Sequence, residues 1–81
     1  MKSPGLQELY LNAVRREKIP TTFFLVNGFQ MKGTIQAFDS FTVVLQCGGR
    51  QQMLFKHAIS TIIPDSPVSI GVLSDKEDMP N

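Results

Sequence analysis

The sequence has few of the residues that small proteins use to staple themselves together. Among 81 residues it has one cysteine, one histidine, one tyrosine and no tryptophan. One cysteine cannot form an internal disulfide, and no Cys/His cluster offers a structural zinc site. A chain this short rarely builds a core worth more than about 3–5 kcal/mol, so small folds usually need a staple or an oligomer. We therefore expect self-association, with no metal and no cofactor.

Long apolar runs and a strong net charge are also missing. No run approaches the roughly 18 residues of a membrane span, and the N-terminus lacks a signal-peptide pattern. The expected location is therefore the cytoplasm, without membrane contact. A formal net charge of +1 gives no sign of nucleic-acid binding by itself. No nucleophile–base pair, carboxylate pair or phosphate-cradling glycine loop can be assembled, so we predict no catalysis.

The small net charge averages two unlike segments. Residues 1–64 hold seven basic and three acidic residues, a net charge of +4. Residues 65–81 hold one basic and four acidic residues, a net charge of −3, and are interrupted by proline and glycine. An acidic segment with little to bury favours disorder. The sequence therefore predicts one folded domain over residues 1–64 and an acidic, mostly disordered tail over residues 65–81.

The first predicted element is a helix over about residues 6–18. Ser3 is a candidate cap, and Pro4 suits the first turn. Apolar residues at helical spacing predict one buried stripe, made of Leu6, Leu9, Tyr10, Ala13 and Val14. Leu11 lies off this stripe, and Ile19–Pro20 ends the helix.

The stretch from residue 21 to residue 64 is typical of short β-strands. We expect strands over residues 21–26, 29–38, 41–47, 51–56 and 59–63. Asn27–Gly28 predicts a type I′ hairpin turn, and Gly33 predicts a bend or a close backbone approach inside the second strand. One helix followed by five short, bent antiparallel strands indicates a small open barrel of the SH3-like or OB-like type.

Such a barrel leaves strand edges unpaired, and open edges recruit other chains. The link between the last two strands, His57–Ala58, is too short for a simple hairpin, so each strand would pair with a neighbouring copy. A repeated head-to-tail contact closes into a ring if the rotation allows it. The residues alone leave three alternatives open: this ring, a monomeric OB-like binder of single-stranded nucleic acid, or an SH3-like protein-interaction module.

Three stretches of the sequence are specific enough to suggest a family: LQELYLNAVRREKIP, FLVNGFQMKGTIQAFDSFTVVLQ and QQMLFKHAISTIIP. Over about residues 6–64 the chain resembles Hfq, the bacterial Sm-like RNA chaperone. The resemblance implies a mainly β, Sm-like fold with one N-terminal helix and five strongly bent antiparallel strands, assembled into a homohexameric ring. It also implies that the protein binds small regulatory RNAs and mRNAs and promotes their pairing, with RNA-processing proteins as further partners.

The resemblance implies three RNA-binding surfaces, named here by their place on the ring. The proximal residues, expected to bind U-rich RNA at the pore, are Gln7, Ser40, Phe41, Lys56 and His57. The distal residues, expected to bind A-rich or purine-rich RNA on the opposite face, are Phe24, Leu25, Gly28, Phe29, Gln30, Met31, Lys32, Gln52 and Thr61. The rim residues, expected to aid annealing, are Asn12, Arg15, Arg16 and Lys18.

The residue types fit these roles, but each also has a simpler structural explanation. Aromatic rings stack on bases with roughly 1–3 kcal/mol per base, and glutamine can pair with two atoms of adenine. Phe24, Phe29 and Phe41 could equally be core residues, and the basic helix end could simply compensate the helix dipole. Because Phe23 and Phe24 are neighbours in one strand, one of them should be exposed or lie at an interface.

Three positions depart from common family patterns. Ser40 stands where the family often has Asn or Gln, and Phe55 where it often has Tyr, so both positions lose hydrogen-bonding capacity. Gln30 stands where some members have Lys. Together with Phe29 it resembles the Gram-positive type, which favours alternating purine and linker nucleotides.

Overall fold

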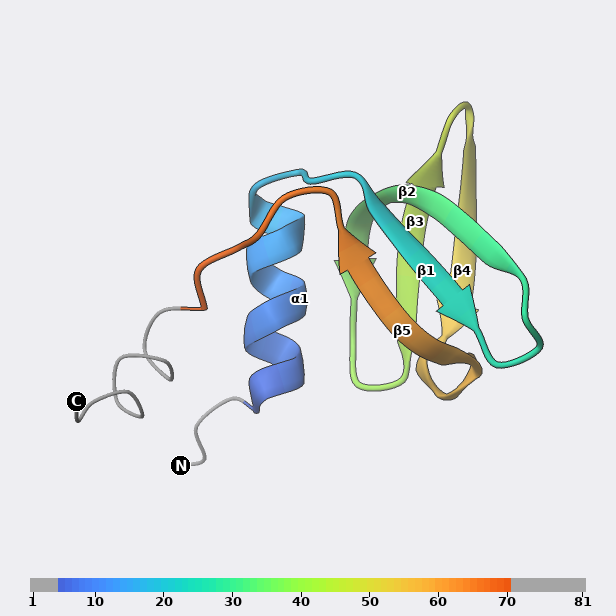
Figure 1. The fold of residues 1–81 in the computed structure, drawn as a ribbon, viewed down its shortest axis with the longest axis horizontal. Coiled ribbons are helices and arrows are strands. Elements are labelled where there is room, and N and C mark those ends of the chain that lie inside the picture. Colours follow the sequence, from blue (N-terminus) through green and yellow to red (C-terminus); the bar gives the residue numbers. More distant parts are fainter. Residues whose placement is uncertain (1–4, 71–81) are drawn as a thin grey trace.

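The computed structural model describes residues 5–70, which form one helix and five strands. The helix is α1 (Leu6–Arg16), and the strands are β1 (Thr21–Leu25), β2 (Gln30–Phe38), β3 (Thr42–Cys47), β4 (Arg50–Phe55) and β5 (Ile59–Pro64). A short 3₁₀ turn, Lys56–Ala58, joins the last two strands. The strands form one antiparallel sheet in the order β4-β3-β2-β1-β5, strongly bent, with α1 standing beside it (Figure 1). The predicted N-terminal helix and five bent antiparallel strands are confirmed.

The C-terminal end of α1 is a hydrogen-bonded cap that sends the chain back toward the sheet. The Lys18 N–H donates to the Arg15 carbonyl at 3.1 Å, and the Ile19 N–H donates to the Val14 carbonyl at 3.3 Å. This is a Schellman arrangement, which needs one residue in the left-handed conformation. Lys18 takes that conformation with φ of 54°. The helix therefore ends at Arg16, two residues earlier than the sequence predicts.

The predicted buried stripe of α1 is partly wrong. Leu11, expected off the stripe, is only 2% exposed, whereas Leu6 is 57% exposed. Leu11 and Val14 lie one turn apart and both join the core cluster. The buried side of the helix is therefore rotated toward Leu11. Ser3 and Pro4, the expected cap and first-turn residue, lie outside the described residues.

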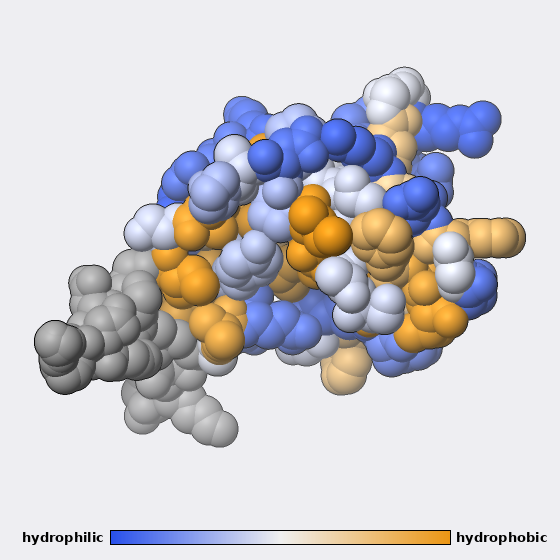
Figure 2. Space-filling model, viewed as in Figure 1, coloured by the Kyte–Doolittle hydropathy of each residue, from blue (hydrophilic) through white to orange (hydrophobic). Residues whose placement is uncertain are grey.

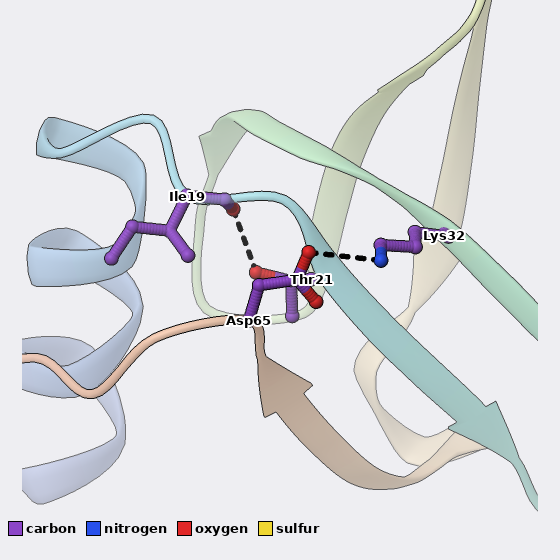
Figure 3. A network of polar contacts seen from close by, with 4 residues as sticks. All are labelled: Ile19, Thr21, Lys32 and Asp65. Atoms are coloured by element: carbon purple, nitrogen blue, oxygen red, sulfur yellow. Dashed lines mark hydrogen bonds and ion pairs between the residues drawn. The ribbon is translucent and has the colours of Figure 1, made fainter.

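The core is built from side chains of α1, of the segment that follows it, and of β1, β2 and β3. Its buried apolar members are Leu11, Val14, Ile19, Phe23, Ile35, Val43 and Leu45. Thr21 is also buried, and its hydroxyl donates to the Ile19 carbonyl at 2.8 Å (Figure 3). Phe23 is fully buried and Phe24 is half-buried, as expected for neighbours on opposite faces of a strand.

The β1–β2 hairpin differs in type from the prediction. A type I′ turn needs positive φ at two residues, but only Gly28 has it here, with φ of 96°. The Gly28 N–H donates to the Leu25 carbonyl at 2.9 Å, and the Leu25 N–H donates to the Phe29 carbonyl at 2.8 Å. This pattern belongs to a three-residue loop that ends in a left-handed glycine. The turn is where the sequence places it, one residue longer.

Gly33 allows the close backbone approach that the sequence predicts. A Cβ atom at this position would lie 2.6 Å from the Gln46 carbonyl oxygen and 2.9 Å from the Cys47 Sγ. Real side chains do not tolerate such distances, so β2 passes β3 closely only because residue 33 is glycine.

The chain remains attached to the domain after β5. The Asp65 N–H donates to the Pro20 carbonyl at 2.9 Å, and Val68 packs against the core. Figure 1 shows this segment running from β5 toward α1. The expected tail thus begins within the described part of the chain. Its residues 71–81 lie outside the described residues.

Candidate nucleic-acid interface

Three of the proximal residues meet where the β2–β3 turn lies beside the 3₁₀ turn. The Lys56 N–H donates to the Phe41 carbonyl at 2.8 Å, which holds the two residues together. Phe41 is 75% exposed, so it is not a core aromatic residue. Lys56 Nζ lies 5.3 Å from the centroid of the Phe38 ring, and the His57 ring stacks on Phe55 at 5.9 Å. This corner of the molecule combines exposed aromatic rings with a cation.

Asp39 fixes the turn that presents Phe41. Its Oδ1 accepts hydrogen bonds from the Phe41 N–H at 2.9 Å, the Thr42 N–H at 2.8 Å and the Thr42 hydroxyl at 2.8 Å. The backbone hydrogen bond from Phe41, followed by those from Thr42, lowers the pKa of Asp39 below its ordinary 3.8. The carboxylate is therefore ionised at neutral pH, and its role is structural.

The other two proximal residues lie in separate hollows. Gln7 shares with Lys56 a hollow of about 330 Å³ between α1 and β5, visible in Figure 2. Ser40 lines a different hollow of about 400 Å³, together with Glu8 and Asn12 of α1. A single chain therefore brings Gln7 and Lys56 to one hollow and turns Ser40 toward the other.

Three distal residues form a row across neighbouring strands. Phe24 on β1 lies opposite Gln30 on β2 and opposite Thr61 on β5. Directly opposite residues in antiparallel strands point to the same face of the sheet. Lys32 occupies the next row of this face, opposite Thr22. The structure thus places an aromatic ring, an amide, a hydroxyl and an amine on one surface.

The β1–β2 hairpin extends this surface with an aromatic residue. Phe29 is 70% exposed, which excludes a role in the core of this chain. Gly28 beside it has no side chain to cover the ring, and its left-handed backbone turns the chain at that point. Leu25 is half-buried where β1 meets β5 and pairs with Ile59.

The remaining two distal residues do not join this row. Met31 lies opposite the buried Phe23, so its side chain points to the core side of the sheet. Gln52 lies opposite Leu45 on the last strand of the sheet, and β3 and β2 separate it from β1. Both residues are half-buried in a single chain.

The rim residues line two shallow hollows between α1 and β2, with volumes of about 350 and 450 Å³. Arg15 lines both hollows, Asn12 the first and Lys18 the second. Arg15 Nη2 donates to Asn12 Oδ1 at 2.6 Å, which holds the guanidinium in place. Arg16 is exposed on the same end of the helix.

The structure adds two residues that the sequence interpretation missed. Gln36 lines both rim hollows because the register of β2 against β3 shifts between Ile35 and Ala37, leaving Gln36 as the extra residue of a bulge. Phe38 lines a rim hollow and also carries the Lys56 amine over its ring. The alternation of apolar and polar residues in β2 places Gln36 and Phe38 on the polar side of the strand, and this pattern could have identified both.

Within residues 5–70 no group of three or more His, Cys, Asp or Glu side chains could hold a metal ion. In that same part of the chain, no helix has the length and apolar character needed to cross a membrane.

Known proteins resemble this chain over nearly its whole described length. The family model described as "Hfq protein" matches residues 6–69. "RNA-binding protein Hfq" of Moorella thermoacetica is 58% identical over 66 residues, covering 82% of this chain and 79% of that protein. The protein of the same name from Pelotomaculum thermopropionicum is 59% identical over 65 residues, covering 80% and 78%.

Solved structures agree with this similarity. A crystal structure described as the pleiotropic translational regulator Hfq is 39% identical, with a TM-score of 0.71, and covers 73% of this chain and 98% of that chain. An Hfq protein from Anabaena sp. has a TM-score of 0.66 at 24% identity, covers 74% and 98%, and supports the fold alone. The extent of the family match and the identity to these relatives lead to one conclusion: the chain belongs to the Hfq family.

Proposed function

We propose that this protein is an RNA chaperone that binds small regulatory RNAs and mRNAs in the cytoplasm and promotes their base pairing, without breaking a covalent bond. One observation carries the proposal: Phe29 and Phe41 are 70% and 75% exposed, with Gln30 next to Phe29 in the chain and the Lys56 N–H bonded to the Phe41 carbonyl. Exposed rings of this kind are stacking platforms for single-stranded RNA. Relatives named as RNA-binding proteins support the same interpretation.

The working form of the protein is a homohexameric ring. The strand order leaves one edge of β4 and one edge of β5 without a neighbour among the described residues. Met53, Phe55 and Ile63 on these two strands are exposed apolar side chains in the single chain. Pairing β4 of one copy with β5 of the next covers both edges and some of this apolar surface.

The ring also explains why the distal residues are incomplete in one chain. When β4 of one copy lies beside β5 of the next, the strand that carries Gln52 becomes the neighbour of the strand that carries Thr61. Gln52, which lies opposite the buried Leu45 in a single chain, is then separated from the row of Phe24, Gln30 and Thr61 by no intervening strand. We assign this composite surface to A-rich or purine-rich RNA.

The other two surfaces take different parts of an RNA. The proximal residues bind U-rich RNA, since Phe41 offers a stacking face and Lys56 a phosphate contact beside it. The rim residues contact phosphates weakly along the hollows between α1 and β2, which reduces repulsion between two RNAs. Ser69 and Ile70 are the last described residues, and the rest of the acidic tail has no part in these assignments.

The test combines native mass with RNA binding. We expect native mass spectrometry at micromolar concentration to give a species of about six chains of 9.0 kDa each. Fluorescence anisotropy with short U-rich and A-rich oligonucleotides should give two independent sites, each weakened by added salt. A stable monomer would overturn the ring, and salt-independent binding or none would overturn the RNA-binding function.

A further inference from the structure

A single ion pair joins β2 to the chain that follows β5. Lys32 Nζ lies 2.9 Å from Asp65 Oδ2, and the two side chains are 54% and 47% exposed (Figure 3). It is the one ion pair within residues 5–70. Lys56, the cation of the proximal residues, has no such acidic partner in that part of the chain and lies over the Phe38 ring instead.

The backbone positions Asp65 independently of its side chain. Pro64 pairs with Thr21 at the end of β5, and the next N–H, that of Asp65, donates to the Pro20 carbonyl at 2.9 Å. Thr21 is itself buried and bonded to Ile19 at 2.8 Å. The Asp65 backbone is therefore anchored without the ion pair, and it would keep the carboxylate near Lys32 when the pair opens.

Lys32 lies on the surface proposed to bind purine-rich RNA. It occupies the row beside Phe24 and Gln30, on the same face of the sheet. It is also the one basic residue among the nine distal residues. Its amine is therefore the natural contact for a phosphate on this surface, and Asp65 already occupies it.

We propose that Asp65 weakens RNA binding to the distal surface, because it competes with RNA phosphates for Lys32. An ion pair between half-exposed side chains is weak, so a phosphate can displace the carboxylate. The displaced carboxylate remains nearby and repels the RNA backbone. Phosphate attraction, which is independent of sequence, is thereby reduced. Stacking on Phe29 and pairing with glutamine, which depend on the bases, then supply a larger share of the binding free energy.

The inference rests on the proposed RNA-binding function, and its test uses Asp65→Asn in the full-length protein. We expect this variant to bind a short A-rich oligonucleotide about fivefold more tightly at low salt, as expected for removing one like charge near the RNA. A C-rich oligonucleotide of the same length should gain by the same factor, so the A-rich to C-rich affinity ratio stays unchanged, because the removed repulsion does not depend on sequence. The slope of log affinity against log salt should steepen by about 0.7, one phosphate contact on a single strand.

Two further variants separate this competition from a general charge effect. Glu17→Gln removes the same charge at the end of α1, and we expect the A-rich affinity to stay at the wild-type value. In a Lys32→Ala background, Asp65→Asn should change the salt slope far less than it does in the wild type. Asp65→Glu should restore wild-type behaviour.

The outcomes distinguish the inference from the function beneath it. Unchanged affinity and salt slope in Asp65→Asn overturn the competition while leaving A-rich binding by the wild type intact. An Asp65→Asn effect of equal size without Lys32 also overturns it. If the wild type binds no A-rich RNA, the proposed distal site and this inference fall together.

Discussion

Two turns of this molecule present an exposed phenylalanine by the same local device. In the β1–β2 hairpin, Asn27 Oδ1 accepts a hydrogen bond from the Phe29 N–H at 3.0 Å. In the β2–β3 turn, Asp39 Oδ1 accepts one from the Phe41 N–H at 2.9 Å. In both cases a side-chain oxygen bonds the backbone two residues further on, which is the Asx turn. Each device orients a ring at the start of a strand.

The two turns differ in the charge around the ring. Phe41 lies beside Lys56, whose amine forms no ion pair within the described residues, although its charge contributes to the lowered pKa of Asp39. Phe29 precedes Gln30 and lies near the surface where Asp65 pairs with Lys32. The two rings are thus held in the same way but have different neighbours. Next to Phe41 a cation attracts phosphates, and next to Phe29 an amide recognises bases.

The largest effect should come from removing one ring at a time. We expect Phe29→Ala to weaken binding of A-rich RNA at least about fivefold and to spare U-rich RNA, because stacking is worth roughly 1–3 kcal/mol per base. Phe41→Ala, the matched control, should do the reverse. Anisotropy titrations with both oligonucleotides measure this. Equal losses for both RNAs in both variants would show that the two turns do not serve separate sites.

The second effect separates charge from stacking at the proximal turn. We expect Lys56→Ala to weaken U-rich RNA several-fold and to reduce its salt slope by about 0.7 for the lost phosphate contact. Phe41→Ala should weaken the same RNA without changing the slope. A-rich RNA serves as the internal control for both variants. If the two variants gave the same salt slope, Lys56 would not act on phosphate.

The third effect concerns the two side chains that hold the turns. Hydrogen bonds from Phe41 and Thr42 lower the pKa of Asp39 from 3.8. Because the folded-state pKa is the lower one, the carboxylate contributes stability above about pH 3.8, and this contribution is lost as the pH falls through the folded-state pKa. We expect the stability of Asp39→Asn to fall less than that of the wild type as the pH is lowered.

The matched control for that experiment is Asn27→Asp, which adds a carboxylate to the other turn. Thermal unfolding between pH 7 and pH 2.5 at fixed protein concentration measures both variants. The wild type and Asp39→Asn should differ more at pH 7 than at pH 2.5. A constant difference across this range would contradict the assigned role of the Asp39 carboxylate.

The sequence predicts the elements well because their signals are local. The alternation of β2, the asparagine–glycine turn and the proline after α1 each act within a few residues. Local signals do not predict whether Phe29 and Phe41 are exposed, because a phenylalanine at the start of a strand can face either the core or the solvent. The turn geometry decides this, and the Asn27–Gly28 pair formed a loop of a different type from the predicted one.

Features that depend on distant parts of the chain were harder to predict. Leu11 is buried because the sheet covers that flank of α1, which helical periodicity alone does not indicate. The bulge at Gln36 shifts the phase of β2 and brings an amide to the rim hollows. The Lys32–Asp65 pair joins residues from two separate elements. No spacing pattern in the sequence predicts such an ion pair.

The smallest effect concerns the rim residue Lys18. Its left-handed backbone conformation, and not a side chain that holds a turn, lowers the stability of the fold. Lys18 has φ of 54° at the position where a helix cap usually has glycine. We expect Lys18→Gly to raise stability by about 0.5–1 kcal/mol, because it relieves the left-handed strain but gains entropy in the unfolded chain. The same change should slow the annealing of two complementary RNAs, since the rim loses a cation.

Lys18→Ala separates the two roles of this residue. It removes the amine but keeps a Cβ in the left-handed conformation, so annealing should slow as in Lys18→Gly while the unfolding temperature stays near the wild-type value. Annealing rates and thermal unfolding at one protein concentration measure both properties. Lys18→Gly could instead be more stable and still anneal RNA at the wild-type rate. The Lys18 amine would then have no function at the rim, and the strained backbone at this position would have no functional explanation.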